Sequence, residues 1–246
     1  MLHICNQANR HLYKQQLSQM HRQRNELFVK TKGWNLKVID GGEYDEGDDD
    51  RAIYLLSLDE IGNCFGSIRV RPADDFSMVI DKMPHHVAGD AAELRKDPHL
   101  WEMARWVNVG NDRAAGEETR IGLIEYLLSQ GCAQCLALPD IGMLAYAIRT
   151  GWRARAIGAP TPYPEGGVAV AVSLPITAEE VAHVRRVTGR SDAFLIDIDP
   201  AAPWAQTPLP VIEAIFKAQA ASGVSQGELG ICADARLRAT PSPKAA

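Results

Sequence analysis

The sequence has no apolar run that approaches the ~20 residues needed to cross a membrane. Its opening stretch, MLHICNQANR, contains no apolar segment of the kind that a secretory signal carries. The formal net charge of −5 gives no basic excess for binding nucleic acid. These absences predict a cytoplasmic protein that binds neither membranes nor nucleic acid.

Cysteine is scarce and scattered, with five residues in the chain. Cys132 and Cys135 form a single CxxC pair, but neither a second pair nor a histidine cluster stands at zinc-binding spacing. The pair falls between an expected helix and an expected strand. We therefore expect two small buried hydrophobic residues and no metal site, with metal or redox use of the pair as the alternative.

Hydrophobic periodicity predicts an α/β protein. Helical spacing of apolar residues predicts a helix from His11 to Val29, and alternation predicts a hairpin of strands 52–58 and 64–71. An irregular excursion follows over 72–100. The other predicted elements are strands at 34–39, 101–109, 134–138 and 168–174, and helices at 117–130, 141–149 and 177–187. This order is typical of an α/β sandwich with a mixed sheet.

The length of 246 residues and the 46% hydrophobic content fit one domain of moderate size, or one domain with an appendage. After Gly189 the chain becomes rich in proline and alanine, with one amphipathic helix expected around Val211 to Ala221. We therefore predict a domain over residues 1–188 and a C-terminal extension over 189–246, with that helix and a disordered tail.

Two features place charge where apolar residues are expected. Arg24 lies on the apolar stripe of the first helix, and an inward cation needs a partner. A core arginine paired with some carboxylate is the simplest interpretation. The acidic, glycine-flanked segment 41–50 follows, and such a charge run is usually solvated surface.

The predicted strand at 101–109 carries Glu102 and Arg105 among apolar residues. In a regular strand these two side chains would point to opposite faces. A β-bulge between them would bring both into one site. We predict that bulge, and a regular ladder through Met103 and Ala104 would count against it.

Taken in order, these motifs resemble those of the acyl-homoserine-lactone synthase (autoinducer synthase) family. The resemblance covers about residues 5 to 185 and includes RxxxF followed by Trp, an acidic YDxxD loop, the strand GSIR and ExxR. Thr150 to Trp152 and Gly158 to Pro160 also match. The positions that match the charged and aromatic residues of the family pattern are Arg24, Phe28, Trp34, Asp45, Asp48, Arg69, Glu102 and Arg105.

The resemblance implies a GNAT-like fold, which is a three-layer α/β/α sandwich with a mixed, mostly antiparallel sheet. It implies acylation of S-adenosylmethionine by an acyl thioester, then lactonisation with release of methylthioadenosine, to make a quorum-sensing signal. S-adenosylmethionine is a substrate, and no permanently bound cofactor is expected. The catalytic residues expected are Glu102, Arg69 and Arg105, and those expected to bind S-adenosylmethionine are Arg24, Phe28, Trp34, Asp45, Asp48 and Trp106.

A GNAT-type N-acyltransferase that acts on another amine is the alternative. Such an enzyme would hold the pyrophosphate of coenzyme A with an RxxGxG/A segment ahead of a helix. The nearest match, Arg113 to Gly116, is followed by Glu117 and Glu118, which are poor neighbours for phosphate. The chain also departs from the family pattern at Val70 to Pro72, in the long segment 74–100 and after Gly189. These departures bear on the acyl group more than on the reaction.

The expected acyl donor is an acyl carrier protein, with acyl-CoA as the alternative. A carrier protein is strongly acidic, so an acidic enzyme needs a local basic patch to attract it. Arg149, Arg153 and Arg155 supply such a patch, with no acidic residue between them in the sequence. Arg149 also fits the simpler role of a cation at a helix C-terminus.

Overall fold

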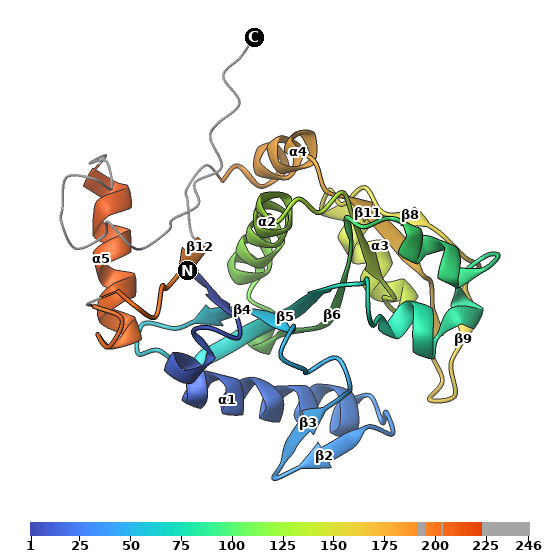
Figure 1. Cartoon of the computed structure of the whole chain (residues 1–246), viewed down its shortest axis with the longest axis horizontal. Coiled ribbons are helices and arrows are strands. Elements are labelled where there is room, and N and C mark those ends of the chain that lie inside the picture. Colours follow the sequence, from blue (N-terminus) through green and yellow to red (C-terminus); the bar gives the residue numbers. More distant parts are fainter. Residues whose placement is uncertain (191–194, 203, 223–246) are drawn as a thin grey trace.

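The computed structural model describes residues 1–190, 195–202 and 204–222, and an eight-stranded mixed sheet forms its centre (Figure 1). The strands are, in spatial order, β12 (Leu195–Asp197), β1 (Leu2–Cys5), β4 (Ile53–Leu58), β5 (Cys64–Pro72), β6 (Leu100–Asn108), β7 (Gln134–Ala137), β11 (Val172–Pro175) and β8 (Arg155–Ala156). The pairs β12–β1 and β6–β7 are parallel, and the other pairs are antiparallel. The predicted mixed, mostly antiparallel sheet is confirmed.

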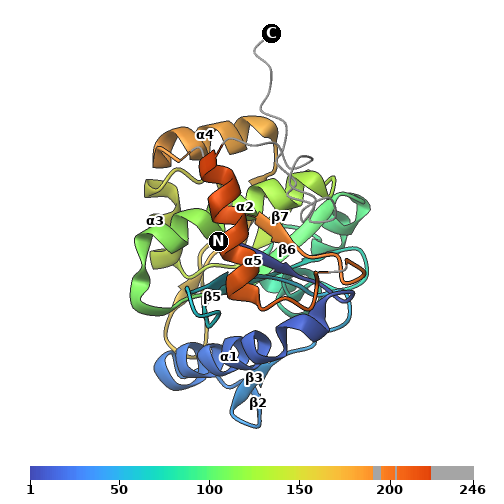
Figure 2. The ribbon, with the colours of Figure 1, turned by 90° about the vertical axis from the view of Figure 1, so that its left-hand side faces the viewer.

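Helices cover both faces of this sheet. The α-helices are α1 (Lys14–Arg24), α2 (Arg113–Ser129), α3 (Ile141–Arg149), α4 (Ala178–Thr188) and α5 (Leu209–Ser222). Figures 1 and 2 show α1 on one side of the sheet and α2 with α4 on the other. None of the helices in the described part of the chain combines the length and the apolar character that a membrane span requires.

The side chains of β4 show how the sheet separates two apolar cores. Leu55 is buried with Ile68 and with Leu127 of α2, whereas the next residue, Leu56, is buried with Met20 of α1. Successive side chains of a strand point to opposite faces, so one strand contributes to both cores. The interpretation of the sequence as a layered α/β sandwich is confirmed.

Two helices differ from their predicted bounds. The first begins as a 3₁₀ turn (Arg10–Tyr13), continues as α1 and then widens into a π-helix (Asn25–Thr31). The second, α2, begins at Arg113 rather than at residue 117, because the Asp112 carboxylate accepts hydrogen bonds from the backbone N–H groups of Ala114 and Ala115. Both helices occupy the predicted parts of the chain.

The segment between β5 and β6 is compact rather than extended. It contains three short helical turns, η3 (Met78–Lys82), η4 (Pro84–His86) and η5 (Ala91–Lys96). Val79 and Ile80 are buried there against Leu100 and Leu136 of the sheet. The segment is therefore a packed wall at the ends of β6 and β7.

Two small sheets lie outside the main one. The hairpin of β2 (Lys37–Ile39) and β3 (Gly42–Tyr44) forms the first, and β9 (Thr161–Pro162) with β10 (Val168–Ala169) forms the second. The strand predicted over 168–174 is therefore wrong as a single element. Val168 and Ala169 pair with β9, and only the residues from Val172 onward join the main sheet.

The segment after Gly189 adds to the same sheet and core. β12 pairs with β1, and Ile212 and Phe216 of α5 are buried in the core on the α1 side. The predicted helix is confirmed as α5, whereas the domain boundary at residue 188 stays a prediction. The tail predicted to be disordered falls on 223–246, outside the described residues.

Glu213 holds α5 against the start of the chain. Its carboxylate accepts a hydrogen bond of 2.9 Å from the amino group of Met1, lies 3.0 Å from Nζ of Lys217 and is 3.6 Å from Nε2 of His3. Burial alone would raise the pKa of Glu213, but these three partners outweigh it and lower the pKa to about 2.

We predict that Glu213→Gln destabilises the protein by about 2 kcal/mol at neutral pH, because the stabilised carboxylate is lost. A depressed carboxyl pKa contributes stability above the pKa of the unfolded chain, and this contribution disappears as the pH falls from about 4.5 towards 2. Thermal unfolding between neutral pH and pH ~3 measures both effects. If the difference in stability between the wild-type protein and Glu213→Gln does not shrink on acidification, this account is contradicted.

Candidate active site

Six charged side chains, each at most 11% exposed, form one ion-pair network beneath the β2–β3 hairpin. The network consists of Arg24, Arg69, Arg105, Glu43, Asp45 and Asp48. Three guanidinium groups face three carboxylates, so the formal charges cancel. Five of the six residues, all except Glu43, are ones that were assigned to the site from the sequence.

Arg24 is the most deeply buried arginine of the network, and its side chain is 0% exposed. Its Nε donates to Glu43 at 2.6 Å, and its two terminal nitrogens donate to the two oxygens of Asp48 at 2.7 Å each. This bidentate contact holds the acidic loop in one orientation, and it also pairs the negative charge of Asp48. The prediction of an inward arginine paired with carboxylates is confirmed.

Arg69 and Arg105 close the network from the sheet. Arg69 donates to Asp48 at 2.8 Å and makes two hydrogen bonds to Asp45. Arg105 lies 3.0 Å from Glu43 and 2.8 Å from Asp45. The two sheet arginines therefore share Asp45, so they and the loop hold one another in place.

The network determines the protonation state of its acids. Burial alone would raise the pKa of Asp48, but the hydrogen bonds and charge of Arg24, and the charge of Arg69, outweigh burial and hold the pKa well below its ordinary value. The pKa of Asp45 is lowered in the same way, by Arg69 and then Arg105 acting against burial. Both carboxylates are thus ionised at neutral pH.

Glycine lets the acidic loop lie directly over the arginines. A Cβ on Gly47 would stand only 2.7 Å from Nη2 of Arg69, and one on Gly42 would stand 2.9 Å from Cβ of His21. Neither position has room for a side chain. The two glycines therefore allow the β2–β3 hairpin and the acidic loop to press onto α1 and β5.

An aromatic wall stands beside the network. The rings of Phe28 and Trp34 stack with their centroids 5.1 Å apart and an interplanar angle of 14°. The guanidinium carbon of Arg105 lies 5.5 Å from the centre of the Phe28 ring, and Tyr163 meets Trp34 edge-on. The π-helix brings Phe28 to this position, so the structure unites both predicted aromatic residues with the charged network.

The irregularity of β6 lies one residue beyond its predicted place. Glu102, Met103 and Ala104 pair regularly with β5, so the bulge predicted there is wrong in position. The register shifts between Ala104 and Val107, and Arg105 has a φ of 57°. This left-handed residue is the extra residue of a β-bulge, and it turns the Arg105 side chain towards the network.

Glu102 lies on the same side of the sheet as Arg69 and is 3% exposed. It accepts hydrogen bonds from the hydroxyl of Ser77 and from the backbone N–H groups of Met78 and Val79. Burial raises the pKa of Glu102, and these hydrogen bonds offset part of the increase. Glu102 thus joins β6 to the start of η3, and it makes no ion pair with Arg105 within 4 Å in the described residues.

Trp106 does not join the network. The ring of Trp106 lies 5.8 Å from that of Trp152 and packs against the core on the α2 side. It lines a small cavity together with residues of α2 and α3. The bulge explains this placement, because the alternation resumes immediately after Arg105.

Sequence reasoning missed several residues of the site. Glu43 is fully buried between Arg24 and Arg105, and the hydroxyl of Tyr54 donates to Asp48 at 3.0 Å. Ser77, which anchors Glu102, was also missed. The signal for Glu43 was its position two residues before Asp45, which puts both acids on one face of an extended segment.

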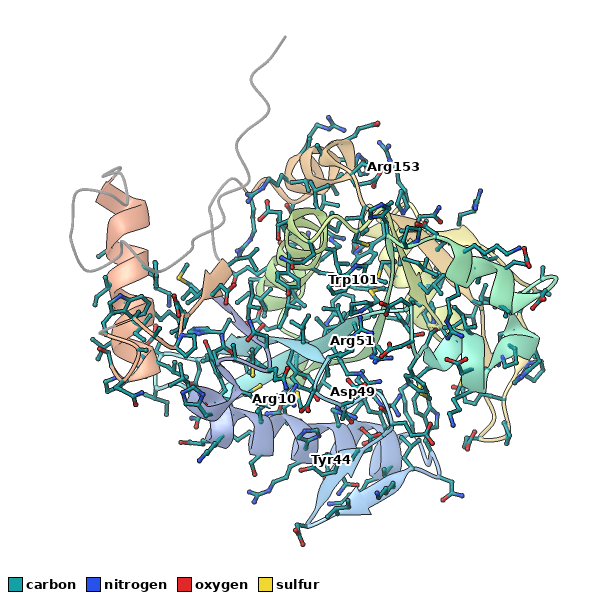
Figure 3. All side chains as sticks on the ribbon, viewed as in Figure 1. Arg10, Tyr44, Asp49, Arg51, Trp101 and Arg153 are labelled. Carbon is teal, nitrogen blue, oxygen red and sulfur yellow. The ribbon has the colours of Figure 1, made fainter. Side chains whose placement is uncertain are left out.

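The basic patch predicted from sequence is partly neutralised. Arg153 lies 2.9 Å from Glu179 and 3.1 Å from Glu180 of α4. Arg149 and Arg155 have no ion pair within 4 Å among the residues that the structure describes. Figure 3 shows Arg153 at the α4 end of the molecule, away from Tyr44 of β3 and from Asp49 of the acidic segment.

The CxxC pair is buried, as predicted. Cys132 and Cys135 are free thiols with 3% and 0% exposure. Burial raises the pKa of Cys132 to about 12, so its thiol is protonated at neutral pH.

Comparisons with known proteins identify the family of the chain. The family model "Autoinducer synthase" matches residues 8–184. The isovaleryl-homoserine lactone synthase of Bradyrhizobium diazoefficiens is 32% identical over 163 residues, which cover 65% of this chain and 73% of that protein.

Solved structures agree as well. A CoA-dependent acyl-homoserine lactone synthase, BjaI, solved with S-adenosylmethionine and isopentyl-CoA, has a TM-score of 0.71 and 25% identity and covers 87% of this chain and 99% of its own. A putative N-acetyltransferase from Lactobacillus plantarum shares the fold alone, with a TM-score of 0.51, 13% identity and coverage of 71% and 98%. The GNAT-like fold is confirmed. The chain belongs to the autoinducer synthase family, whose members are acyl-homoserine-lactone synthases.

Proposed function

We propose that this enzyme makes an acyl-homoserine lactone with the ion-pair network as its S-adenosylmethionine site and Glu102 as its base. The observation that carries this assignment is the network itself. Three arginines and three acids are assembled from four segments, α1, the acidic loop with β3, β5 and β6, beside a stacked aromatic pair. This arrangement suits a substrate that carries a carboxylate, an ammonium and a sulfonium.

The outer members of the network are the ones we assign to the substrate. The side chains of Asp45 and Arg105 are 11% and 9% exposed, compared with 0% for Arg24 and Glu43. Asp45 is placed to accept hydrogen bonds from the substrate ammonium, and Arg105 to donate to its carboxylate. The inner pair, Arg24 and Glu43, holds these groups in position.

Phe28 and Trp34 are assigned to the sulfonium and the adenine. An aromatic face attracts a cation, and a stacked aromatic pair offers a flat surface to a base. Phe28 already faces the guanidinium of Arg105. The substrate would therefore lie along the aromatic wall, with its amino-acid end at Asp45 and Arg105.

Acylation requires an uncharged amine, and an α-amino group has a pKa of roughly 8. We assign Glu102 as the base that accepts the proton, through an intervening water molecule. The raised pKa of this carboxyl suits the role, because a more basic carboxylate accepts a proton more readily. The amine then attacks the thioester carbonyl, the C–S bond breaks and the thiol leaves with a proton.

Lactonisation requires mainly orientation. The substrate carboxylate attacks the γ-carbon, the bond from that carbon to sulfur breaks, and the electron pair converts the sulfonium into the neutral thioether of methylthioadenosine. A sulfonium is a good leaving group, so holding the carboxylate in line supplies most of the catalysis. Arg105 is placed for this role.

The acyl group is assigned to the opposite side of β6. The pairing of β6 with β7 ends at Glu102 and Leu136, although β6 continues to Asn108. The strands part there, beside the cavity that Trp106 and Trp152 line. A thioester that enters between the strands would put its carbonyl near Glu102 and its acyl chain near Trp106.

A GNAT enzyme that holds the pyrophosphate of coenzyme A at the start of α2 is disfavoured. The Asp112 carboxylate already occupies the N–H groups of Ala114 and Ala115, and Arg113 is paired with Glu117 at 2.9 Å. A phosphate there would meet two carboxylates. Acyl-CoA would have to bind with its pyrophosphate elsewhere.

For the donor, we propose acyl-CoA first and acyl carrier protein as the alternative. The similar structure solved with an acyl-CoA is a CoA-dependent enzyme, and the pairing of Arg153 with Glu179 weakens the predicted carrier-protein patch. We also propose a cytoplasmic location. The buried free thiols of the described residues suit a reducing compartment.

The reaction is tested by incubating the enzyme with S-adenosylmethionine and a panel of acyl thioesters. We expect methylthioadenosine and an acyl-homoserine lactone in equal amounts, detected by mass spectrometry. Release of an acylated amine other than homoserine lactone would support the N-acyltransferase alternative. Absence of both products with every donor would overturn the proposed function.

We predict that Glu102→Gln lowers kcat by roughly 100-fold or more, as expected for loss of a general base, while S-adenosylmethionine still binds. Ser77→Ala is the matched control, because it removes the anchor of Glu102 and keeps the carboxylate. We expect a loss of less than about tenfold there. Calorimetric titration of S-adenosylmethionine separates binding from chemistry. If both variants lose binding and activity equally, Glu102 has a structural role.

The donor is tested by comparing kcat/KM for matched acyl-CoA and acyl-carrier-protein substrates, and we expect the higher value with acyl-CoA. Arg149→Glu/Arg155→Glu should raise KM for the carrier-protein substrate, because a patch that attracts an acidic protein is removed. Lys14→Glu/Arg22→Glu, on the exposed face of α1, is the charge-matched control. A preference for the carrier protein that only the first pair abolishes would contradict the CoA assignment.

A further inference from the structure

Arg120 of α2 is a buried cation without a carboxylate partner. The residue is 2% exposed, and one of its terminal nitrogens donates to the carbonyl of Thr150 at the end of α3. Its Nε has no hydrogen-bond partner, and no ion pair within 4 Å involves Arg120 in the described part of the chain. A buried guanidinium is costly unless its donors are satisfied.

A second unsatisfied donor lies at the same place. Trp152 is 5% exposed, and its indole Nε1 has no hydrogen-bond partner among the residues that the structure describes. Arg120 and Trp152 line the same small cavity, with Trp106 and Tyr146 as further walls. A guanidinium and an indole can only donate hydrogen bonds, so both residues need an acceptor that the described residues do not supply.

Glu117, the acidic residue among the described residues that line this cavity, is not the missing acceptor. Glu117 is held 2.9 Å from Arg113 and 3.7 Å from Arg190, and it has no ion pair with Arg120. Its negative charge also disfavours an anionic guest. The donors therefore suit a neutral acceptor oxygen, such as a keto or hydroxyl oxygen.

The contact of Arg120 with Thr150 does not account for an arginine at this position. A neutral donor at the C-terminus of α3 would serve that carbonyl without burying a charge. Burial also lowers the pKa of Arg120, and the negative charge of Glu117 opposes only part of this decrease. An arginine at this position is explained if its remaining donor, Nε, makes a hydrogen bond to a ligand.

We propose that Arg120 and Trp152 select acyl groups that carry an acceptor oxygen on the chain. This inference rests on the proposed function, in which the acyl chain enters beside Trp106. The oxygen would accept hydrogen bonds from Nε of Arg120 and Nε1 of Trp152, while Trp106 and Tyr146 contact the hydrocarbon. A saturated acyl group would leave both donors buried and unpaired, and such a loss discriminates strongly between substrates.

The test compares saturated, 3-oxo and 3-hydroxy acyl-CoA substrates in butanoyl, hexanoyl and octanoyl series, with methylthioadenosine release as the readout. We expect the wild-type kcat/KM for an oxygenated substrate to exceed that for the saturated one of equal length by about tenfold or more. A preference for 3-oxo over 3-hydroxy would identify a keto oxygen as the better guest. Equal use of both would assign the selection to any acceptor oxygen.

Two variants connect this ratio to the residues. Arg120→Met removes the charge and its donors, and Trp152→Phe keeps an aromatic ring and removes only the N–H. Each should bring the oxygenated-to-saturated ratio down several-fold, towards one. If Arg120→Met does not fold, as thermal unfolding will show, Trp152→Phe and Arg120→Lys carry the test.

Two results would overturn the inference in an active enzyme. The first is a wild-type ratio near or below one in all three series. The second is a ratio unchanged in the variants that fold. Failure of the proposed function is a different result, because no thioester of any kind would then release methylthioadenosine.

Discussion

The site depends on the burial of Arg24 between Glu43 and Asp48. A guanidinium in the interior is tolerated only when its donors are satisfied, so this one contact fixes the rotation of α1, the seating of the β2–β3 hairpin and the path of the acidic loop. Arg69 and Arg105 then complete a group with no formal net charge. Removing one member would leave an unmatched charge in the interior, so the six residues act as a unit.

Strand β6 connects this network to the rest of the reaction. Glu102 anchors the packed segment that begins at Ser77, and Arg105 closes the network, within one short stretch of chain. The strand also continues to Asn108, beyond Glu102, where its pairing with β7 ends. Binding of the amino-acid substrate, proton transfer and entry of the thioester are thus assigned to neighbouring residues of a single element.

Much of this arrangement could be predicted from the sequence, because charge in an apolar pattern is rare and informative. Arg24 and the pair Glu102 and Arg105 stood out for that reason. Glu43 did not, because an acid in an acidic loop looks solvated until the fold covers it. The bulge was misplaced by one residue, since periodicity shows that a phase change is needed but not which peptide takes a positive φ. Arg120 was not singled out from the sequence, because a charged residue is common in a helix.

The phase change at Arg105 has a wider consequence. Because the strand resumes its alternation at once, Arg105 belongs to the polar side of the sheet and Trp106 to the hydrocarbon side. The sheet thus separates two compartments, and the adjacent residues Arg105 and Trp106 face different ones. Insertion or deletion of a single residue here would shift the alternation of β6, so that side chains now on one side of the sheet would point to the other. On the proposed placement of the acyl group beside Trp106, acyl preference can diverge by substitution on one side of the sheet while the chemistry on the other side stays fixed.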